Sequence, residues 1–241
     1  MYKNKLKNKT TVWIKIFLLM VMLFLPGCRK NIAVKENVLP ASGIEKILIF
    51  PFKDMSAVYG ENVNTRCPIC GKVFMTGKVA EDADNMLTEQ LFILLKDRKD
   101  IELIPASQSQ GVVSDLLSED KKRLSERNLL IETGRILNAD LVLSGYIFRF
   151  RERVGGKYSV DLPASVAFDI HLIRVADGHL LWSDHFDETQ RPLSENLFQL
   201  GSFLHRKAKW ITANEMAVSG LKNILKTFPI LNKPEPKVTS Q

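Results

Sequence analysis

The stretch from Leu141 to Phe186 decides the fold, and it reads LVLSGYIFRFRERVGGKYSVDLPASVAFDIHLIRVADGHLLWSDHF. Apolar and polar side chains alternate through most of it, which is typical of strands that bury one face. Two glycine-containing turns interrupt the alternation, Val154-Gly155-Gly156 and Ala176-Asp177-Gly178. Glycine adopts the left-handed backbone that a three-residue hairpin loop requires. The stretch therefore predicts a meander of three antiparallel strands.

The alternation also predicts the register of these strands. Opposed residues of a hairpin share a face, so the even-numbered apolar residues are expected together in the core. The buried pairs are then Phe150 with Val160, Phe148 with Leu162 and Leu172 with Trp182, and the outward pairs are Arg149 with Asp161 and Asp169 with His185. Pro163 lacks an N–H group for the ladder, which indicates a bulge or an edge at that point.

The segments on either side of the meander complete the domain. Ile47-Leu48-Ile49-Phe50 is a continuous apolar run before Pro51, as expected of a central strand buried on both faces. Apolar residues at spacings of three and four predict several helices, and short apolar runs predict further strands. In chain order we expect a helix over 78–96, a strand over 101–104, helices over 107–117 and 121–137, and one long C-terminal helix from Ser194 to Lys226. The fold class is α/β (α+β): a single domain with a mixed sheet, the meander, and helices that cover the sheet.

The amino-terminal segment has the pattern of a secretory leader. Lysines from Lys3 to Lys9 precede an apolar run, Ile16 to Leu25, which leads into Leu25-Pro26-Gly27-Cys28. Ten helical residues cover about 15 Å, half of the roughly 30 Å of a bilayer core, so a cleaved signal peptide is favoured over a membrane-spanning anchor. The alternative is a simple secretory signal beside a chance cysteine.

Leu25 to Cys28 resembles the lipobox of bacterial lipoproteins, with Pro26 in place of the usual small or aliphatic residue. The resemblance implies cleavage before Cys28 and attachment of diacylglycerol and an acyl chain such as palmitate to that residue. Arg29 follows, instead of the aspartate that marks retention at the inner membrane, which implies the periplasmic face of the outer membrane. The expected organisation is a signal peptide at 1–27, a tether at 28–43, the α/β domain at 44–228 and a disordered tail at 229–241.

Composition places the chain among soluble globular proteins, with 241 residues, 45% apolar and 25% charged. Its net charge of +7 comes mostly from five lysines in the first 27 residues; without them, 29 basic residues face 27 acidic ones. A nucleic-acid partner therefore has no electrostatic support in the mature chain.

Cys67-Pro68-Ile69-Cys70-Gly71 has the form of a zinc knuckle, in which two thiolates of a tight turn hold a metal ion. Three interpretations stay open. The first is a Cys67–Cys70 disulfide, which the oxidising periplasm favours. The second is a zinc site completed by histidines or by a second subunit. The third is a redox-active pair, although the motif follows no recognisable βα unit.

No catalytic residues are predicted. Asp169 beside His185 could orient an imidazole, but no nucleophile-elbow sequence accompanies the pair. Trp182 is expected in the core. The sequence also lacks a glycine-rich phosphate loop and a complete metal site, so we predict that the chain is not an enzyme. We expect no cofactor other than the lipid on Cys28, with zinc as the alternative at the cysteine pair.

Three segments carry a wider resemblance. The first strand with Pro51-Phe52, the run 137–145 and the hairpin 175–183 resemble envelope lipoproteins of the curli-secretion-channel type. The same core is similar to the amino-terminal domain of the Tol-system β-propeller protein and to lipoprotein activators of penicillin-binding proteins. The resemblance covers most of residues 44–225 and implies an α/β domain that other envelope components bind.

We therefore predict a lipid-anchored binding or assembly module whose partners are the membrane and other cell-envelope proteins. The alternatives are a metal or redox protein that uses Cys67 and Cys70, or a subunit of an oligomeric secretion pore. The pore would need the hairpin from Phe148 to Leu172 to be free. Association into homo-oligomers stays open.

Overall fold

The computed structural model describes residues 38–40, 46–118, 124–156, 160–190 and 210–232. Its centre is a mixed sheet in the strand order β11-β10-β7-β2-β6, with β3 also paired to β7. β7 (Leu141–Arg151), β10 (Ser165–Arg174) and β11 (Leu180–Thr189) form the antiparallel part, whereas β2 (Lys46–Ile49), β3 (Lys53–Asp54) and β6 (Glu102–Ile104) add parallel pairings. The predicted α+β fold class and the meander are confirmed.

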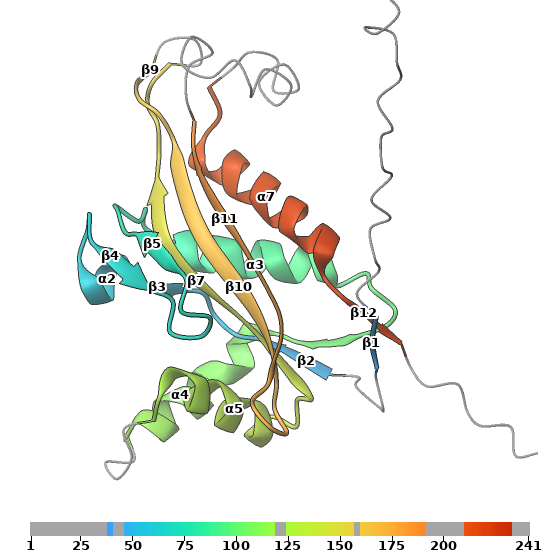
Figure 1. The fold of residues 1–241 in the computed structure, drawn as a ribbon. Coiled ribbons are helices and arrows are strands. Elements are labelled where there is room, and N and C mark those ends of the chain that lie inside the picture. Colours follow the sequence, from blue (N-terminus) through green and yellow to red (C-terminus); the bar gives the residue numbers. More distant parts are fainter. Residues whose placement is uncertain (1–37, 41–45, 119–123, 157–159, 191–209, 233–241) are drawn as a thin grey trace, which may run out of the picture. The chain divides into compact units, whose positions relative to one another are not determined.

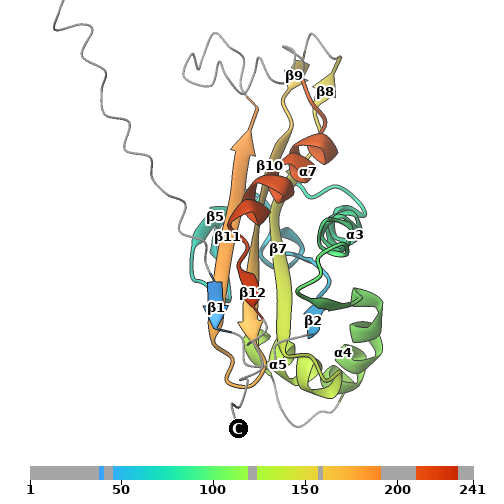
Figure 2. The ribbon, with the colours of Figure 1, turned by 90° about the vertical axis from the view of Figure 1, so that its right-hand side faces the viewer.

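Helices and short strands surround this sheet (Figure 1, Figure 2). The helices are α2 (Ser56–Tyr59), α3 (Ala83–Leu95), α4 (Ser109–Ser118), α5 (Glu126–Ile136) and α7 (Ala213–Ile224), with 3-10 turns at Ala106–Gln108 and Leu225–Thr227. Three small two-stranded sheets are formed by β4 (Asn64–Arg66) with β5 (Val73–Met75), β8 (Val154–Gly155) with β9 (Val160–Leu162), and β1 (Val38–Pro40) with β12 (Ile230–Asn232). Figure 1 places α4 and α5 at one end of the long strands and β9 at the other. Among the described residues, no helix is both long and apolar enough to cross a membrane.

Two apolar clusters fill the two sides of the sheet. The first joins the inner faces of α3 and α7 to strand residues such as Ile47, Phe168 and Leu172. The second joins α5 and the cysteine segment to residues such as Leu48, Tyr146 and Phe148. Residues 47–49 of β2 are all apolar because they contribute to both clusters, Ile47 and Ile49 to the first and Leu48 to the second. The predicted central strand is confirmed.

The predicted register is correct in one hairpin and wrong in the other. In the β10–β11 hairpin, Leu172 pairs with Trp182 and Asp169 with His185 as expected. Gly178 in its turn has a φ of 70°, the left-handed conformation that was predicted. In the other hairpin, β7 pairs directly with β10, and Phe150 lies opposite Val166.

The pairs predicted between β7 and residues 160–162 are therefore wrong, because β9 pairs with β8 instead. The chain is outside any strand at Pro163, where the sequence predicted an interruption. A bulge adds a second difference: Ala167 pairs with Arg149 and Phe168 with Ile147, so Phe148 is passed over. Since an extra residue reverses the alternation of faces, Tyr146 and Phe148 lie on the opposite side of the sheet from Phe150.

Three segments differ from their predicted boundaries. The long C-terminal helix is shorter, because residues 210–212 are not helical and Thr212 caps α7. Residues 191–209 lie outside the described part of the chain. The segments predicted as tether and tail contribute the paired strands β1 and β12. Leucines 39 and 231 stand opposite each other in this pair, and short apolar segments of this kind carry too little periodicity to be recognised as strands.

Candidate metal centre

The two cysteines lie in a tight turn between β4 and β5. The Cys67 N–H donates to the carbonyl oxygen of Lys72 (2.8 Å), and the Gly71 N–H donates to the carbonyl oxygen of Cys67 (3.0 Å). Gly71 has a φ of 75°, which residues with a side chain rarely adopt. The N–H groups of Ile69 and Cys70 both donate to Cys67 Sγ, at 3.4 and 3.5 Å. Such donors stabilise negative charge on the sulfur atom.

Two more polar side chains lie near the cysteines, and both come from β10. Asp169 and His171 are two residues apart on one strand, so they point to the same side of the sheet. Residues 56–75 comprise α2, β4 and β5, and we call them the projection; their residues Cys67, Ile69 and Phe74 pack against this side of the sheet. Asp169 and His171 are 1% and 0% exposed. The predicted outward position of Asp169 is therefore wrong, because the projection covers this part of the face.

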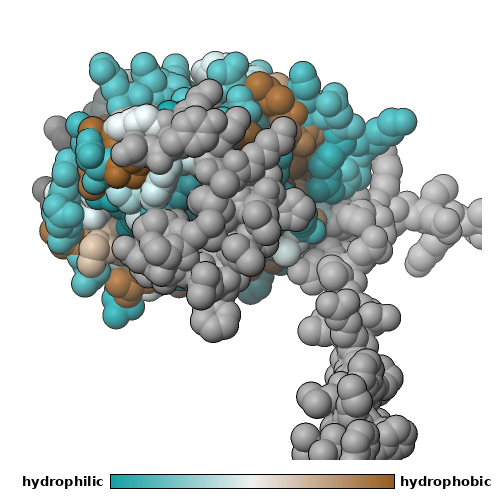
Figure 3. All heavy atoms as spheres, turned by 90° about the horizontal axis from the view of Figure 1, so that it is seen from above, coloured by the Kyte–Doolittle hydropathy of each residue, from teal (hydrophilic) through white to brown (hydrophobic). Residues whose placement is uncertain are grey.

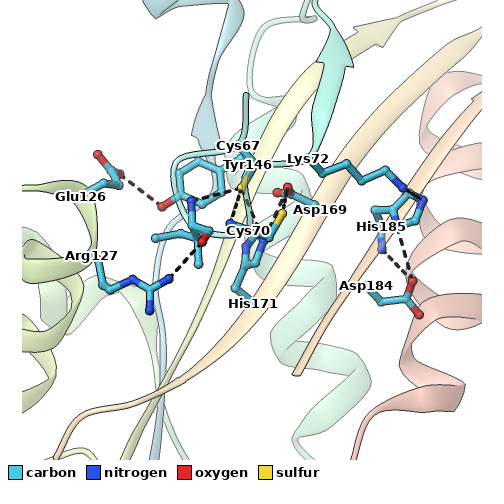
Figure 4. A network of polar contacts seen from close by, with 11 residues as sticks. Cys67, Cys70, Lys72, Glu126, Arg127, Tyr146, Asp169, His171, Asp184 and His185 are labelled. Atoms are coloured by element: carbon cyan, nitrogen blue, oxygen red, sulfur yellow. Dashed lines mark hydrogen bonds and ion pairs between the residues drawn. The ribbon is translucent and has the colours of Figure 1, made fainter. Parts of the chain in front are cut away.

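Four side chains converge where the projection meets β10, a place that we call the seam (Figure 4): Cys67, Cys70, Asp169 and His171. Cys67 Sγ is 3.5 Å from His171 Nε2, Cys70 Sγ is 3.8 Å from Asp169 Oδ2, and His171 Nε2 is 3.6 Å from Asp169 Oδ2. One ligand atom from each of the four residues lies within 4.8 Å of the others. This is the geometry of donors arranged around one point.

Packing and hydrogen bonds hold the projection on the sheet. The ring of Phe74 in β5 stacks on Phe148 of β7, with centroids 4.0 Å apart. Arg127 of α5 donates to the carbonyl oxygen of Ile69 (3.0 Å), and Arg149 of β7 donates to that of Met75 (3.1 Å). The cysteine turn is thus fixed between α5 and β7.

Burial dominates the electrostatics of the cluster. It raises the pKa of Asp169 to about 7 and lowers the pKa of His171 to about 4. The positive charge of Arg127 also lowers the pKa of His171. Burial, followed by the charge of Asp169, also raises the pKa of Cys67. Each shift favours the neutral form, because a charged group loses its hydration when it is buried. The neutral imidazole is the form that binds metal ions.

The arrangement differs from that of a catalytic or redox site. In a nucleophile–histidine–acid triad the acid binds the ring nitrogen opposite the nucleophile. Here Asp169 and Cys67 both approach Nε2 of His171, while Nδ1 has no partner. Reactive cysteines have a lowered pKa, whereas that of Cys67 is raised and its side chain is buried. Convergence of two thiols, a carboxylate and an imidazole is typical of metal binding.

Sequence reasoning found half of this site. Cys67 and Cys70 were predicted from their spacing. Both are free thiols in this structure, so the Cys67–Cys70 disulfide, the first of the three interpretations of the motif, is not formed here. His171 and Asp169 were missed as partners of the cysteines. The available signal was an aspartate and a histidine two residues apart in an otherwise apolar strand, because buried polar residues require partners. Cys28, the predicted lipidation site, lies outside the described residues.

The predicted neighbours Asp169 and His185 are Cα partners across β10 and β11. Their side chains nevertheless have different contacts. His185 lies against Lys72 and the ring of Phe74, whereas Asp169 contacts Cys70 and His171. Trp182 lies in the core as predicted, and its indole N–H donates to Thr227 Oγ1 (3.2 Å).

Comparison with known families gives one match. The model of the family described as peptidoglycan-synthase activator LpoB matches residues 82–187, which run from the residue before α3 into β11. Lipoprotein activators of this kind were one of the groups that the sequence resembles. The comparisons give no support to the resemblance to the curli-secretion channel or to the Tol-system protein. No curated protein matches the chain.

Several solved structures match the chain at low identity. A PelC dodecamer from Paraburkholderia phytofirmans is 14% identical, with a TM-score of 0.43, over 80% of this chain and 94% of that one. The LpoB C-terminal domain from Salmonella enterica is 16% identical, with a TM-score of 0.40, over 64% and 88%. Lipoprotein GNA1162 from Neisseria meningitidis is 12% identical, with a TM-score of 0.37, over 68% and 98%.

Proposed function

We propose that this chain is a non-catalytic lipoprotein on the periplasmic face of the outer membrane, which binds and activates a peptidoglycan synthase. The observation that carries the proposal is the match of the activator family model to residues 82–187. Those residues include α3, α4, α5 and the three strands of the meander, so the match concerns the centre of the fold.

The leader supports the location. The lysine-rich start, the apolar run and Cys28 together favour a chain attached by lipid, and Arg29 favours the outer membrane. Acyl chains on one cysteine provide firm attachment, since each buried methylene contributes about 0.8 kcal/mol. A domain attached in this way faces the compartment where peptidoglycan is built.

The projection is the surface that we expect the synthase to contact. Its exposed apolar side chains are Val58, Tyr59, Val63, Val73 and Met75, with exposed fractions of 43–55%. They account for five of the ten exposed large apolar side chains in the described part of the chain. Clustered apolar side chains on short irregular elements are typical of protein-binding surfaces. Seen from above, the part of the surface that grey atoms do not cover shows apolar groups among hydrophilic residues (Figure 3).

The test is glycan polymerisation by a purified bifunctional penicillin-binding protein, with lipid II as substrate. The full-length lipidated chain is added in mild detergent at increasing concentration. We expect a saturable rise in polymerisation rate and co-sedimentation of the two proteins. If the rate stays unchanged at saturating chain and the proteins do not associate, the proposed function is wrong.

Two variants locate the contact. Replacement of both Val73→Ser and Met75→Ser removes two apolar side chains of β5 that point to solvent, so we expect weaker binding with an unchanged circular dichroism spectrum. Leu117→Ser on α4 is the matched control, because Leu117 is 65% exposed and lies outside the projection. Loss of binding in the control alone would move the contact to α4 and leave the function standing.

A further inference from the structure

The cluster at the seam has the ligand types of a closed zinc site. Zinc favours cysteine sulfur, histidine nitrogen and carboxylate oxygen, and four protein ligands with no open position are typical of a structural site. Cys67, Cys70, Asp169 and His171 provide two sulfurs, one oxygen and one nitrogen. Thiolates also disfavour magnesium and calcium, which prefer oxygen ligands.

Three of the six distances between these atoms are close to the edges of a tetrahedron around zinc. With usual bond lengths of about 2.0–2.3 Å, the edges of such a tetrahedron measure about 3.3–3.8 Å. The three measured contacts are 3.5 Å for sulfur to nitrogen, 3.8 Å for sulfur to oxygen and 3.6 Å for nitrogen to oxygen. The nitrogen-to-oxygen contact is long for a hydrogen bond, and all three contacts are close to ligand-to-ligand distances.

Unpartnered polar atoms are a second, independent observation. Asp169 Oδ1 and His171 Nδ1 are buried and have no hydrogen-bond partner, although the two side chains are only 2% and 0% exposed. Ser144, which pairs with His171 across β7 and β10, has an unpartnered hydroxyl as well. A buried carboxyl group with an unpartnered oxygen is costly, and a cation bound at Asp169 would compensate for that part of the cost.

The surroundings also suit a metal ion. Two N–H groups donate to Cys67 Sγ and so support a thiolate there. A dication bound by two thiolates and a carboxylate has a net charge of −1, and the positive charges of Arg127 and Lys72 act on His171 and Asp169. Each thiol releases its proton as it binds the ion, so binding requires no oxidant or reductant.

We propose that Cys67, Cys70, Asp169 and His171 bind one zinc ion, which fastens the projection to β10. This inference goes beyond the proposed function, because zinc binding is measured on the isolated chain and requires no synthase. The ion joins a local turn to a central strand, and it would keep the projection in one orientation.

The experiment uses the full-length chain, purified with reductant, stripped with a chelator and titrated with Zn²⁺ against a chromophoric competitor. We expect one zinc per chain, no response to Mg²⁺, and the visible spectrum of tetrahedral thiolate-bound cobalt when Co²⁺ replaces zinc. Cys70→Ser is the main variant, since Cys70 is exposed and its loss disturbs packing least. Loss of a residue that only hydrogen-bonds to a ligand lowers metal affinity by about 10–100-fold. Because Cys70 is proposed as a ligand itself, we expect a larger fall in zinc affinity for Cys70→Ser.

Asp169→Asn and His171→Gln should weaken zinc binding as well, and His185→Gln is the matched control that should leave it unchanged. Circular dichroism shows whether each variant is folded. A reduced wild-type chain that takes up no zinc overturns the proposal. Binding that is lost in Cys70→Ser but unaffected by both β10 variants overturns it too, because the cysteines alone would then hold the ion.

Discussion

Gly145 on β7 has no room for a side chain. A Cβ atom at this position would lie 2.2 Å from Cε1 of the Phe52 ring. Phe52 is 3% exposed and packs in the cluster beneath α3 and α7, so it has little freedom to move aside. Glycine here permits the close approach of a buried ring to the strand.

We therefore predict that Gly145→Ala lowers the free energy of unfolding by about 1–3 kcal/mol, as overpacked core sites usually do. The control is Gly111→Ala in α4, where nothing lies within 4 Å of the added Cβ. Alanine favours a helix over glycine by up to about 1 kcal/mol, so the control should be neutral or stabilised. Urea unfolding of both variants measures the difference, and equal shifts would contradict the prediction.

Asp169 shows what could not be predicted from single residues. Its pairing with His185 follows from alternation, and that pairing is confirmed. Its burial follows from a separate segment, the projection, which reaches this face from a position about 100 residues earlier in the chain. Periodicity identifies which residues share a face, but it carries no information about which distant segment covers that face.

Among the elements, α7 owes its start to a capping box. Thr212 Oγ1 accepts from the Glu215 N–H (3.1 Å), and Glu215 Oε2 accepts from the Thr212 N–H (2.8 Å). These bonds satisfy two backbone N–H groups at the amino-terminal end of α7, so the helix begins after Thr212 rather than further upstream. Apolar spacing alone continued the pattern back to Ser194, because it does not register a cap within a periodic run.

Thr212→Ala should lower the free energy of unfolding by about 1 kcal/mol, the usual effect of losing a capping side chain. Thr212→Ser keeps the hydroxyl and is the matched control, for which we expect little change. Thermal or urea unfolding distinguishes the two variants. If alanine and serine behave alike, the hydroxyl does not stabilise α7 and the capping argument fails.

Strand register illustrates the same point within the sheet. The loop between β10 and β11 is short, so its residues define most of the pairing of the two strands. Between β7 and β10 the chain makes a separate small hairpin, β8–β9, and β7 carries a bulge at Phe148. A bulge depends on local twist and leaves no sequence signature, which is why two of the three residues predicted on one face of β7, Tyr146 and Phe148, lie on the other face.

For the whole molecule, the position of β7 and β10 bears on the pore alternative. That alternative needs a long hairpin that is free to leave the domain. Most residues of both strands are buried, and each strand lies between two others in the sheet. Among the described residues of this hairpin, the strands that extend beyond the sheet are β8 and β9, with two and three residues. The hairpin that the pore alternative requires is therefore part of the domain core.

We predict that the lipidated chain, extracted in mild detergent, has the mass of a monomer or a dimer by size exclusion with light scattering. A ring needs many copies that each contribute structure to its wall, and the described strands are committed to their own sheet. A discrete species of many copies would contradict the prediction and return the pore to consideration, with conductance across liposomes as its direct measurement.

The sequence distance between the two halves of the cluster has a consequence for how the protein matures. The cysteine turn is closed by bonds between residues a few positions apart, whereas His171 is 104 residues from Cys67 and Asp169 is 99 from Cys70. Local contacts form early in folding, and distant strand pairing is slow. In the oxidising periplasm that we propose for this chain, the two thiols are close enough to react with each other during that interval. The rate at which β10 joins β7 would then decide whether the chain is trapped in an oxidised form or reaches the state with free thiols.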